Sequence, residues 1–167
     1  MITHIVFDVD GTLTDGGITV SDNGVELKTF QAKDGIVVRM LPRLGFTTMI
    51  ITGRNSNLTN IRAEDLDISI TLQGINDKAD TLKSYISEHK LSSEHFAYVG
   101  DDLNDYAAMK LCAFKACPLD AADEVRLLCD YVSIKPGGRG AVRDICEYLL
   151  RRENKYTELL KIFSVDF

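Results

Sequence analysis

The stretch Ile5-Val6-Phe7-Asp8-Val9-Asp10-Gly11-Thr12 is an apolar run that ends in two carboxylates. Its first part predicts a buried strand, because three apolar side chains that favour extended backbone follow one another. Burying Asp8 and Asp10 directly after such a strand is costly unless the acids are hydrogen-bonded, paired with cations or bound to a metal. Gly11 lets the chain turn away without a side-chain clash. We therefore expect a functional site at this strand tip, with both acids on the same side.

The pattern Asp-x-Asp-Gly also occurs in solvated turns and in calcium-binding loops. A calcium loop of the helix-loop-helix type needs a bidentate glutamate late in the loop and a helix on each side. Here a strand precedes the acids, which favours a catalytic site.

The composition is that of one ordinary domain. The chain has 167 residues, of which 45% are hydrophobic, so it can bury a substantial core, and we expect a single domain over residues 1–167.

A net charge of −6 argues against a nucleic-acid or membrane-surface partner, since both attract clustered positive charge. The first residues lack a cationic leader with an apolar run, and no run is long enough to span a bilayer. We expect a soluble cytoplasmic protein.

A β-hairpin is expected at about residues 17–30. Two short alternating runs, Ile18-Thr19-Val20 and Val25-Glu26-Leu27-Lys28, flank a turn that contains Asn23-Gly24. The hairpin interrupts the alternation of strands and helices, so it should project from the body of the domain. Two interpretations stay open: the hairpin serves gating or association, or it is a decorative edge.

The rest of the chain alternates between strand and helix patterns. Nearly all-apolar strands of this kind indicate a parallel sheet covered by helices on both faces, which is a doubly wound, Rossmann-like α/β fold. The expected strands after the first are residues 46–51, 68–72, 96–99, 114–117 and 131–134. The expected helices are 34–44, capped by Asp34, then 56–66, 77–90, 121–128 and 141–152, with a short helix in the C-terminal tail at about 153–167.

Polar side chains follow three of these strands at the point where each strand ends. Asp8 and Asp10 follow the first, Thr52 follows residues 46–51, and Asp101 follows residues 96–99. Ligands of a doubly wound sheet bind beyond the carboxyl ends of its strands, so these side chains should meet. Three carboxylates in one place repel one another without a cation, and oxygen ligands with room for water suit Mg²⁺. A bound Mg²⁺ favours a phosphate substrate.

A phosphate at this place gives each neighbouring side chain a role. Lys78, at the start of a helix, can place its ammonium against the phosphate oxygens and keep Asp8 ionised. Thr52 can donate a hydrogen bond to the phosphoryl group. No serine–histidine pair or reactive cysteine is evident, so Asp8 is the available nucleophile and can form an aspartyl-phosphate. Asp10 is then placed to protonate the leaving alcohol and later to activate water.

These residues resemble the four ordered motifs of the haloacid dehalogenase (HAD) superfamily phosphatases. The motifs are Asp8-Val9-Asp10-Gly11-Thr12, Ile51-Thr52-Gly53-Arg54, Lys78 and Gly100-Asp101-Asp102. The resemblance implies that Asp8 is the nucleophile and Asp10 the acid/base. It also implies that Asp8, the Asp10 carbonyl and Asp101 bind Mg²⁺, and that Thr52 and Lys78 hold the phosphoryl group. It leaves open whether Asp102 or Asp105 supports the metal site without binding the metal directly.

A narrower resemblance covers almost the whole chain, and it is to the 3-deoxy-D-manno-octulosonate 8-phosphate phosphatase family. It is carried by Asp15-Gly16-Gly17 with the hairpin, Lys33-Asp34-Gly35, Thr52-Gly53-Arg54-Asn55-Ser56, Arg62-Ala63, Gln73-Gly74, residues 100–105 and residues 137–143. The resemblance implies a small core without a cap domain and a homotetramer with hairpins at its centre, in which a neighbouring subunit closes each site. No insertion after Asp10 or after Thr52 is large enough for a cap.

The expected substrate is a small acidic sugar phosphate, either 3-deoxy-D-manno-octulosonate 8-phosphate or a sialic-acid-type nonulosonate 9-phosphate. Arg54 and Arg62 suit a sugar carboxylate or hydroxyls because a guanidinium can bind bidentately. Arg62 acts either across a subunit interface or as a solvated charge on its helix, and roles for Arg139 and Arg143 stay open. The residues expected to contact the substrate are Asp10, Thr52, Gly53, Arg54, Arg62 and Lys78.

Two other classes of function remain as alternatives. A receiver-like signalling module shares the doubly wound sheet and its acids, but it places the phosphoacceptor on a central strand after earlier acids and lacks an acid two residues beyond it. A non-catalytic subunit would use the hairpin for binding. The presence of Asp8, Asp10, Lys78 and Asp101 together argues against that second alternative.

Overall fold

A six-stranded parallel sheet forms the middle of the molecule in the computed structural model, which describes residues 1–165. Its strand order is β5-β4-β1-β6-β7-β8, and every neighbouring pair is parallel. The chain starts in the middle of the sheet and winds outward in both directions, so the doubly wound α/β fold is confirmed. The strands are β1 (His4–Phe7), β4 (Thr47–Ile51), β5 (Ile70–Leu72), β6 (Phe96–Val99), β7 (Phe114–Cys117) and β8 (Tyr131–Val132).

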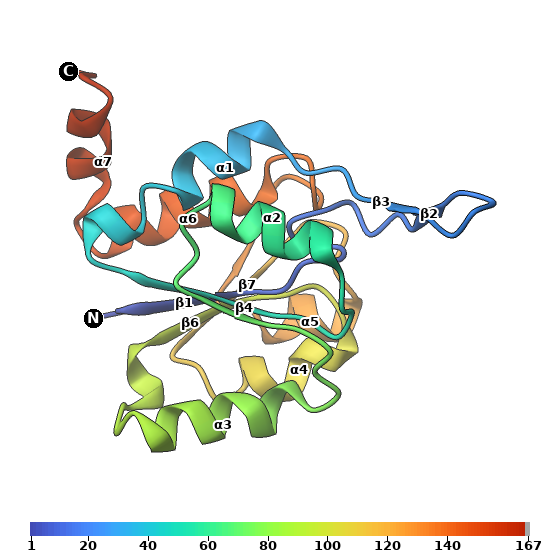
Figure 1. Cartoon of the computed structure of the whole chain (residues 1–167). Helices are drawn as coiled ribbons and strands as arrows, with labels where there is room; N and C mark the ends of the chain where they lie inside the picture. Colours follow the sequence, from blue (N-terminus) through green and yellow to red (C-terminus); the bar gives the residue numbers. More distant parts are fainter. Residues whose placement is uncertain (166–167) are drawn as a thin grey trace.

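Helices cover both faces of this sheet (Figure 1). One face carries α1 (Ala32–Val38), α2 (Asn57–Asp65) and α6 (Ala141–Arg152), and the other carries α3 (Lys78–Glu88), α4 (Leu103–Met109) and α5 (Asp123–Leu128). After α6 the chain forms α7 (Tyr156–Ile162), and short 3₁₀ turns lie at Pro42–Leu44 and Ser93–His95. Within residues 1–165, none of the helices has the length and apolar character that crossing a bilayer requires.

The core consists of two apolar clusters, one on each side of the sheet. Ile5 and Phe7 of β1 belong to the cluster under α1 and α6, whereas Val6 belongs to the cluster over α3 and α4. All three are 0% exposed. Alternate residues of a strand point to opposite faces, so a strand covered on both faces buries its side chains on either side and favours apolar residues. This is why the run before Asp8 is wholly apolar and why polar residues begin only where the strand ends.

The predicted hairpin is present and projects from the body of the molecule (Figure 1). It consists of β2 (Thr19–Val20) and β3 (Glu26–Leu27), which pair antiparallel, with Gly24 in the turn at a positive φ of 81°. Between β1 and β4 the described chain holds only this hairpin, α1 and one 3₁₀ turn. The expected absence of an inserted cap domain therefore agrees with the part of the chain that the structure describes.

The predicted helix over residues 34–44 was wrong at both ends. The structure has α1 over residues 32–38 and then a separate 3₁₀ turn that begins at Pro42, since proline cannot donate the amide that a continuing helix needs. Asp34 is not the cap; Gln31 precedes the helix, and its side chain accepts a first-turn amide at 3.4 Å. Asp34 is instead buried and accepts the backbone amide of Arg143 at 2.9 Å. That contact joins α1 to the start of α6, and no local pattern reveals it.

The remaining predicted elements are confirmed with small shifts of their ends, whereas α4 over Leu103–Met109 was not predicted. The helix predicted over residues 141–152 is present with those bounds, and α3 begins at Lys78. The strands predicted over 68–72 and 131–134 are shorter, at Ile70–Leu72 and Tyr131–Val132, and the helix predicted from residue 121 starts at Asp123. The last two residues of the predicted C-terminal tail lie outside the described range.

Candidate active site

The carboxyl ends of β1, β4 and β6 meet at one edge of the sheet, and their polar residues gather there. Asp8 directly follows β1, Thr52 directly follows β4, and Asp101 lies two residues beyond β6. Oxygen atoms of Asp8, Asp101 and Asp105 all lie within 4.8 Å of one another. The structure thus brings together two of the predicted strand-tip acids and a third from the first turn of α4.

Lys78 lies inside this acidic cluster. Its Nζ donates to Oδ1 of Asp8 at 2.7 Å and to Oδ1 of Asp105 at 2.7 Å, and the residue is 2% exposed. Asp105 is 0% exposed and also accepts the hydroxyl of Tyr98 at 2.9 Å and the backbone amide of Asp101 at 3.1 Å. Asp105 therefore orients Lys78, and through Lys78 it orients Asp8.

Asp102 and Asp105, between which the sequence does not choose, occupy different places in the structure. Asp102 is exposed and caps α4, where its side chain accepts the amide of Leu103 at 2.7 Å. Asp105 is the residue whose carboxylate reaches the cluster. Helix geometry explains the difference, because the cap residue points its side chain at the helix end while the third helical residue faces the sheet.

Two glycines make room for these carboxylates. Gly11 has a φ of +97°, and a Cβ added there would lie 2.0 Å from Oδ2 of Asp101. At Gly100 an added Cβ would lie 2.6 Å from Cγ of Asp105. Thr12 completes the contact by donating its hydroxyl to Oδ1 of Asp101 at 2.9 Å. The glycines of both motifs are therefore needed for close approach of backbone and carboxylate, and Gly11 also for its left-handed conformation.

Burial and crowded negative charge raise the pKa values of two of these acids. The pKa of Asp8 rises to about 6, chiefly because of burial and next because Asp105 is close, although Lys78 opposes both effects. The pKa of Asp101 rises to about 8, chiefly through burial and then through the charge of Asp8. Burial alone lowers the pKa of Lys78, but the two carboxylates outweigh it and raise that pKa above its usual value. The one ammonium thus contacts two of the three carboxyl groups in the cluster.

The oxygen donors of the cluster are compatible with a divalent cation. The oxygens of Asp105 are already occupied by Lys78, Tyr98 and the backbone amide of Asp101. Asp8 and Asp101 keep carboxylate oxygens that these contacts do not use. Hard oxygen ligands with excess negative charge suit Mg²⁺, and such a cation would relieve the repulsion that raises the two pKa values.

The carboxylate of Asp10 contacts the hairpin. It forms an ion pair with the ammonium of Lys28, whose side chain is only 2% exposed, whereas the Asp10 side chain is 19% exposed. The carboxylate of Asp10 does not belong to the group of three within 4.8 Å. Lys28 was missed in the sequence, although the alternation of Glu26 and Lys28 with Val25 and Leu27 already places both charged residues on one side of the strand.

Thr52, Gly53 and Arg54 follow β4 as one segment at the same edge. Thr52 is buried, and its backbone amide donates to Leu72 at 3.0 Å, which fixes the end of the strand. Arg54 extends toward the hairpin, where Nη2 donates to Oε1 of Glu26 at 3.0 Å. Its side chain is 44% exposed, so the guanidinium stays accessible to a ligand.

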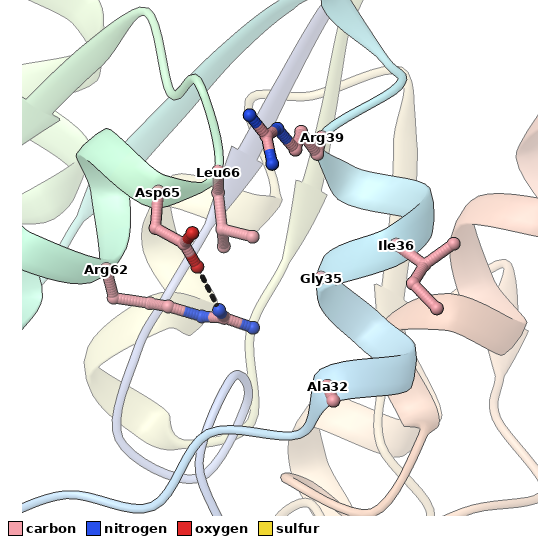
Figure 2. A pocket seen from close by; sticks show the side chains of 7 residues that line it. All are labelled: Ala32, Gly35, Ile36, Arg39, Arg62, Asp65 and Leu66. Carbon is pink, nitrogen blue, oxygen red and sulfur yellow. Dashed lines mark hydrogen bonds and ion pairs between the residues drawn. The ribbon is translucent and has the colours of Figure 1, made fainter.

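Arg62 lies elsewhere, between α1 and α2 (Figure 2). Its Nη1 donates to Asp65 at 2.5 Å, its Nη2 donates to the carbonyl of Gln31 at 3.3 Å, and its guanidinium lies 5.5 Å from the centre of the Phe30 ring. A Cβ at Gly35 would lie 2.5 Å from Nη2, so this glycine makes room for the arginine. Within one subunit, none of these partners belongs to the acidic cluster.

The loop before α6 packs against the turn that follows β1. A Cβ at Gly137 would lie 1.8 Å from the carbonyl oxygen of Gly11. Arg139 donates to Oδ2 of Asp15 at 3.2 Å, so it lies over the same turn. Arg143 instead pairs with Glu147 on α6 at 2.7 Å. The glycine-rich loop therefore supports the backbone that carries Asp10, and Arg143 belongs to the helix rather than to the strand tips.

Comparison with known proteins assigns this arrangement to a family. Residues 54–142 match the model of the haloacid dehalogenase-like hydrolases. Over 157 residues the chain is 36% identical to the 3-deoxy-D-manno-octulosonate 8-phosphate phosphatase KdsC of Escherichia coli K12, a match that covers 94% of this chain and 84% of the relative. The chain belongs to the KdsC phosphatase family. The family resemblance of its motifs is thereby confirmed.

Solved structures of KdsC phosphatases share the whole fold. The crystal structure of the enzyme from Moraxella catarrhalis, in complex with a magnesium ion, a phosphate ion and KDO, has a TM-score of 0.93 and 36% identity, covering 97% of this chain and 93% of that one. The cobalt-bound enzyme from Haemophilus influenzae has a TM-score of 0.87 and 30% identity over 93% of this chain and 91% of that one. Both relatives hold a divalent cation, which agrees with the predicted Mg²⁺ cofactor.

Proposed function

We propose that this protein is a Mg²⁺-dependent phosphatase that releases phosphate from 3-deoxy-D-manno-octulosonate 8-phosphate. The observation that carries the proposal is the buried contact of 2.7 Å between Lys78 and Asp8, beside Asp101, in a chain that is 36% identical to the KdsC phosphatases. The phosphate ion and KDO bound by the Moraxella relative support the same substrate class.

Asp8 is the proposed nucleophile. Because Lys78 binds Oδ1 of Asp8, the carboxylate is held in one orientation and its other oxygen, Oδ2, is free to attack. A bond forms between Oδ2 and phosphorus while the bond between phosphorus and the sugar oxygen breaks. Asp10 gives a proton to that sugar oxygen, which leaves as an alcohol.

Hydrolysis of the aspartyl-phosphate uses the same proton carrier in reverse. Asp10, now ionised, accepts a proton from a water molecule as the water oxygen attacks phosphorus. The bond between Oδ2 and phosphorus breaks, the Asp8 carboxylate is restored and inorganic phosphate leaves. Each cycle therefore consumes one water and returns both aspartates to their starting states.

The proposed metal ligands are carboxylate oxygens of Asp8 and Asp101 together with the backbone carbonyl of Asp10. When bound, Mg²⁺ neutralises charge that develops on the phosphoryl oxygens. Asp105 is not a proposed ligand, since its oxygens already accept hydrogen bonds from Lys78, Tyr98 and a backbone amide.

The proposed substrate contacts divide between phosphate and sugar. Thr52, Gly53 and Lys78 are assigned to the phosphoryl oxygens because they lie at the strand edge beside Asp8. Arg54 is assigned to the acidic end of the sugar, because its guanidinium is accessible and planar. Arg62 has no contact with this edge in one subunit, so its proposed contact with substrate is across a subunit interface.

The hairpin is the proposed centre of a homotetramer. Ile18, Val20, Val25 and Leu27 are each more than half exposed, at 58%, 56%, 52% and 58%. Val20 pairs with Glu26 and Thr19 with Leu27, so apolar side chains occupy both faces of the ribbon. A ribbon with exposed apolar groups on both faces is stabilised when other chains cover both faces. Such an assembly also supplies a neighbour that closes the open site.

We also infer a cytoplasmic location. All four cysteines are free, and three of them are buried. Reduced, buried thiols agree with a reducing compartment. Fractionation of the source cells, with the chain detected by antibody, tests this.

A substrate panel tests the proposed function. Phosphate release is measured with octulosonate 8-phosphate, a nonulosonate 9-phosphate and a hexose phosphate, each with Mg²⁺ and with EDTA. We expect the octulosonate to give the highest kcat/KM and EDTA to abolish turnover. Preference for the nonulosonate would reassign the sugar within the family. A phosphoaspartate that persists for minutes without turnover would instead support a receiver-like module, and lack of hydrolysis of every substrate would support a non-catalytic subunit.

A further inference from the structure

Lys28 is a buried charge that the mechanism above does not use. Its side chain is 2% exposed, and its ammonium pairs with the carboxylate of Asp10 and lies 3.8 Å from Oε1 of Glu26. Lys28 belongs to the hairpin, directly after β3, whereas Asp10 follows β1. In the part of the chain that the structure describes, Lys28 is the one cation within ion-pair distance of Asp10.

The pair is part of a row of alternating charges. Asp10 contacts Lys28, Lys28 contacts Glu26, and Glu26 contacts Nη2 of Arg54 at 3.0 Å. Glu26 and Lys28 are two residues apart on an extended strand, so their side chains leave it on the same side. The second strand of the hairpin therefore bridges two segments of the strand edge, the turn after β1 and the segment after β4.

The contribution of this ion pair to folding stability does not by itself explain why a lysine is buried here. A buried ion pair is often no more stabilising than an apolar pair of similar size, because both charges lose their hydration. An ion pair does, however, fix the orientation of the carboxylate side chain, because the ammonium attracts it to one place. Asp10 lies in a turn and not in a strand or helix, and the ion pair with Lys28 ties its side chain to the hairpin.

We infer that Lys28 is a positioning residue that holds the ionised carboxylate of Asp10 in the orientation needed to accept a proton from the attacking water. The inference rests on the proposed function, in which Asp10 carries the proton between the sugar oxygen and water. Lys28 acts through Asp10 and touches neither the phosphorus nor the nucleophile. It also connects the hairpin to the chemical step, because whatever fixes the hairpin also fixes Lys28.

The inference is tested by steady-state kinetics on octulosonate 8-phosphate. Lys28→Met should lower kcat by roughly tenfold or more, because part of the rate gain from general acid–base catalysis is lost. The KM should change less than about twofold. Lys28→Arg, which keeps a cation, should recover at least about a third of the kcat. In an Asp10→Asn background, Lys28→Met should have almost no further effect, since the two residues act as one unit.

The controls separate this role from folding and from the proposed function itself. Lys83→Met makes the same change at an exposed lysine of α3 and should leave kcat unchanged. Molecular mass by light scattering must match the wild type, and Lys28→Gln replaces Lys28→Met if the latter does not assemble. If wild-type protein hydrolyses nothing, the proposed function fails. If wild type is active, the inference on Lys28 is overturned either by a correctly assembled Lys28 variant that retains kcat or by equal losses in the wild-type and Asp10→Asn backgrounds.

Discussion

Lys78 donates to Asp105 at 2.7 Å, and both residues are almost completely withdrawn from solvent. Replacing Asp105 by alanine leaves three donors without their acceptor, namely Lys78, the hydroxyl of Tyr98 and the amide of Asp101. We expect Asp105→Ala to lower the free energy of unfolding by about 3–5 kcal/mol, as is typical when one partner of a buried ion pair is removed. Urea unfolding measures this loss.

Asp102→Ala is the matched control for that prediction. It removes a neighbouring aspartate that is exposed and only caps α4. The expected loss is about 1 kcal/mol. Equal losses for the two variants would show that Asp105 does not hold the cluster together.

Gly11 and Asp101 approach each other so closely that a methyl group at residue 11 has no space. A Cβ would lie 2.0 Å from Oδ2 of Asp101, and the φ of +97° is unfavourable for alanine. We expect Gly11→Ala to displace Asp101 and to lower kcat/KM by roughly 100-fold, the effect of misplacing a reacting or ligating group by about 1 Å.

The control for Gly11 is Gly74→Ala. Gly74 also has a positive φ, +69°, but nothing lies within 4 Å of an added Cβ. This variant should lose about 1 kcal/mol of stability from backbone strain and keep its activity. If both variants lost activity to the same extent, backbone conformation and not contact with Asp101 would be the cause.

The raised pKa values of Asp8, about 6, and Asp101, about 8, predict how stability depends on pH without metal. In the unfolded chain both groups have a pKa near 4. Between about pH 4 and pH 8 the folded protein therefore binds more protons than the unfolded protein, so its free energy of unfolding rises as the pH falls. Each such proton contributes about 1.4 kcal/mol per pH unit.

Urea unfolding in EDTA at pH 8.5 and pH 6 checks this prediction. Saturating Mg²⁺ should stabilise the protein more at pH 8.5, where its proposed ligands Asp8 and Asp101 are ionised. Asp101→Asn should flatten the pH dependence measured in EDTA. If the free energy of unfolding of the metal-free protein were lower at pH 6 than at pH 8.5, the raised pKa values of Asp8 and Asp101 would be contradicted.

Leu27 is the test position for the proposed assembly. It lies on the hairpin with 58% of its surface exposed, so a lysine there costs little in a monomer but places a charge inside a hairpin-centred tetramer. We expect Leu27→Lys to lower the molecular mass measured by light scattering and to reduce turnover. Leu127→Lys, the same change at a leucine of α5 that is 88% exposed, should alter neither. A tetramer that survives Leu27→Lys would contradict the role of the hairpin.

The sequence predicted the strand tips well, because an apolar run that stops at an acid reports both the strand and its end. Asp8 and Asp101 were found in this way. Prediction from the sequence failed where the role of a residue depends on a partner far away in the chain. Asp34 has the composition of a helix cap, but its partner is the amide of Arg143, 109 residues away. Lys28 lies in a predicted hairpin strand, yet only the folded chain shows that the strand returns to Asp10.

The choice between Asp102 and Asp105 was beyond the sequence for a related reason. Both are acids in the same short motif, and only the path of the helix start decides which one faces the sheet. The assignment of Arg62 to the substrate also stays a prediction, because all its contacts in one subunit lie between α1 and α2.

The proposed role of Asp8 as nucleophile is tested by the turnover of Asp8→Asn with octulosonate 8-phosphate and Mg²⁺. Asparagine keeps the shape and the contact with Lys78 but cannot attack phosphorus, so kcat should fall by at least roughly 1,000-fold. Asp123→Asn, at an exposed position on α5, should retain full activity. Wild-type protein quenched in acid during turnover should carry phosphate on Asp8. An Asp8→Asn variant that keeps more than about a tenth of the wild-type kcat would show that Asp8 is not the nucleophile.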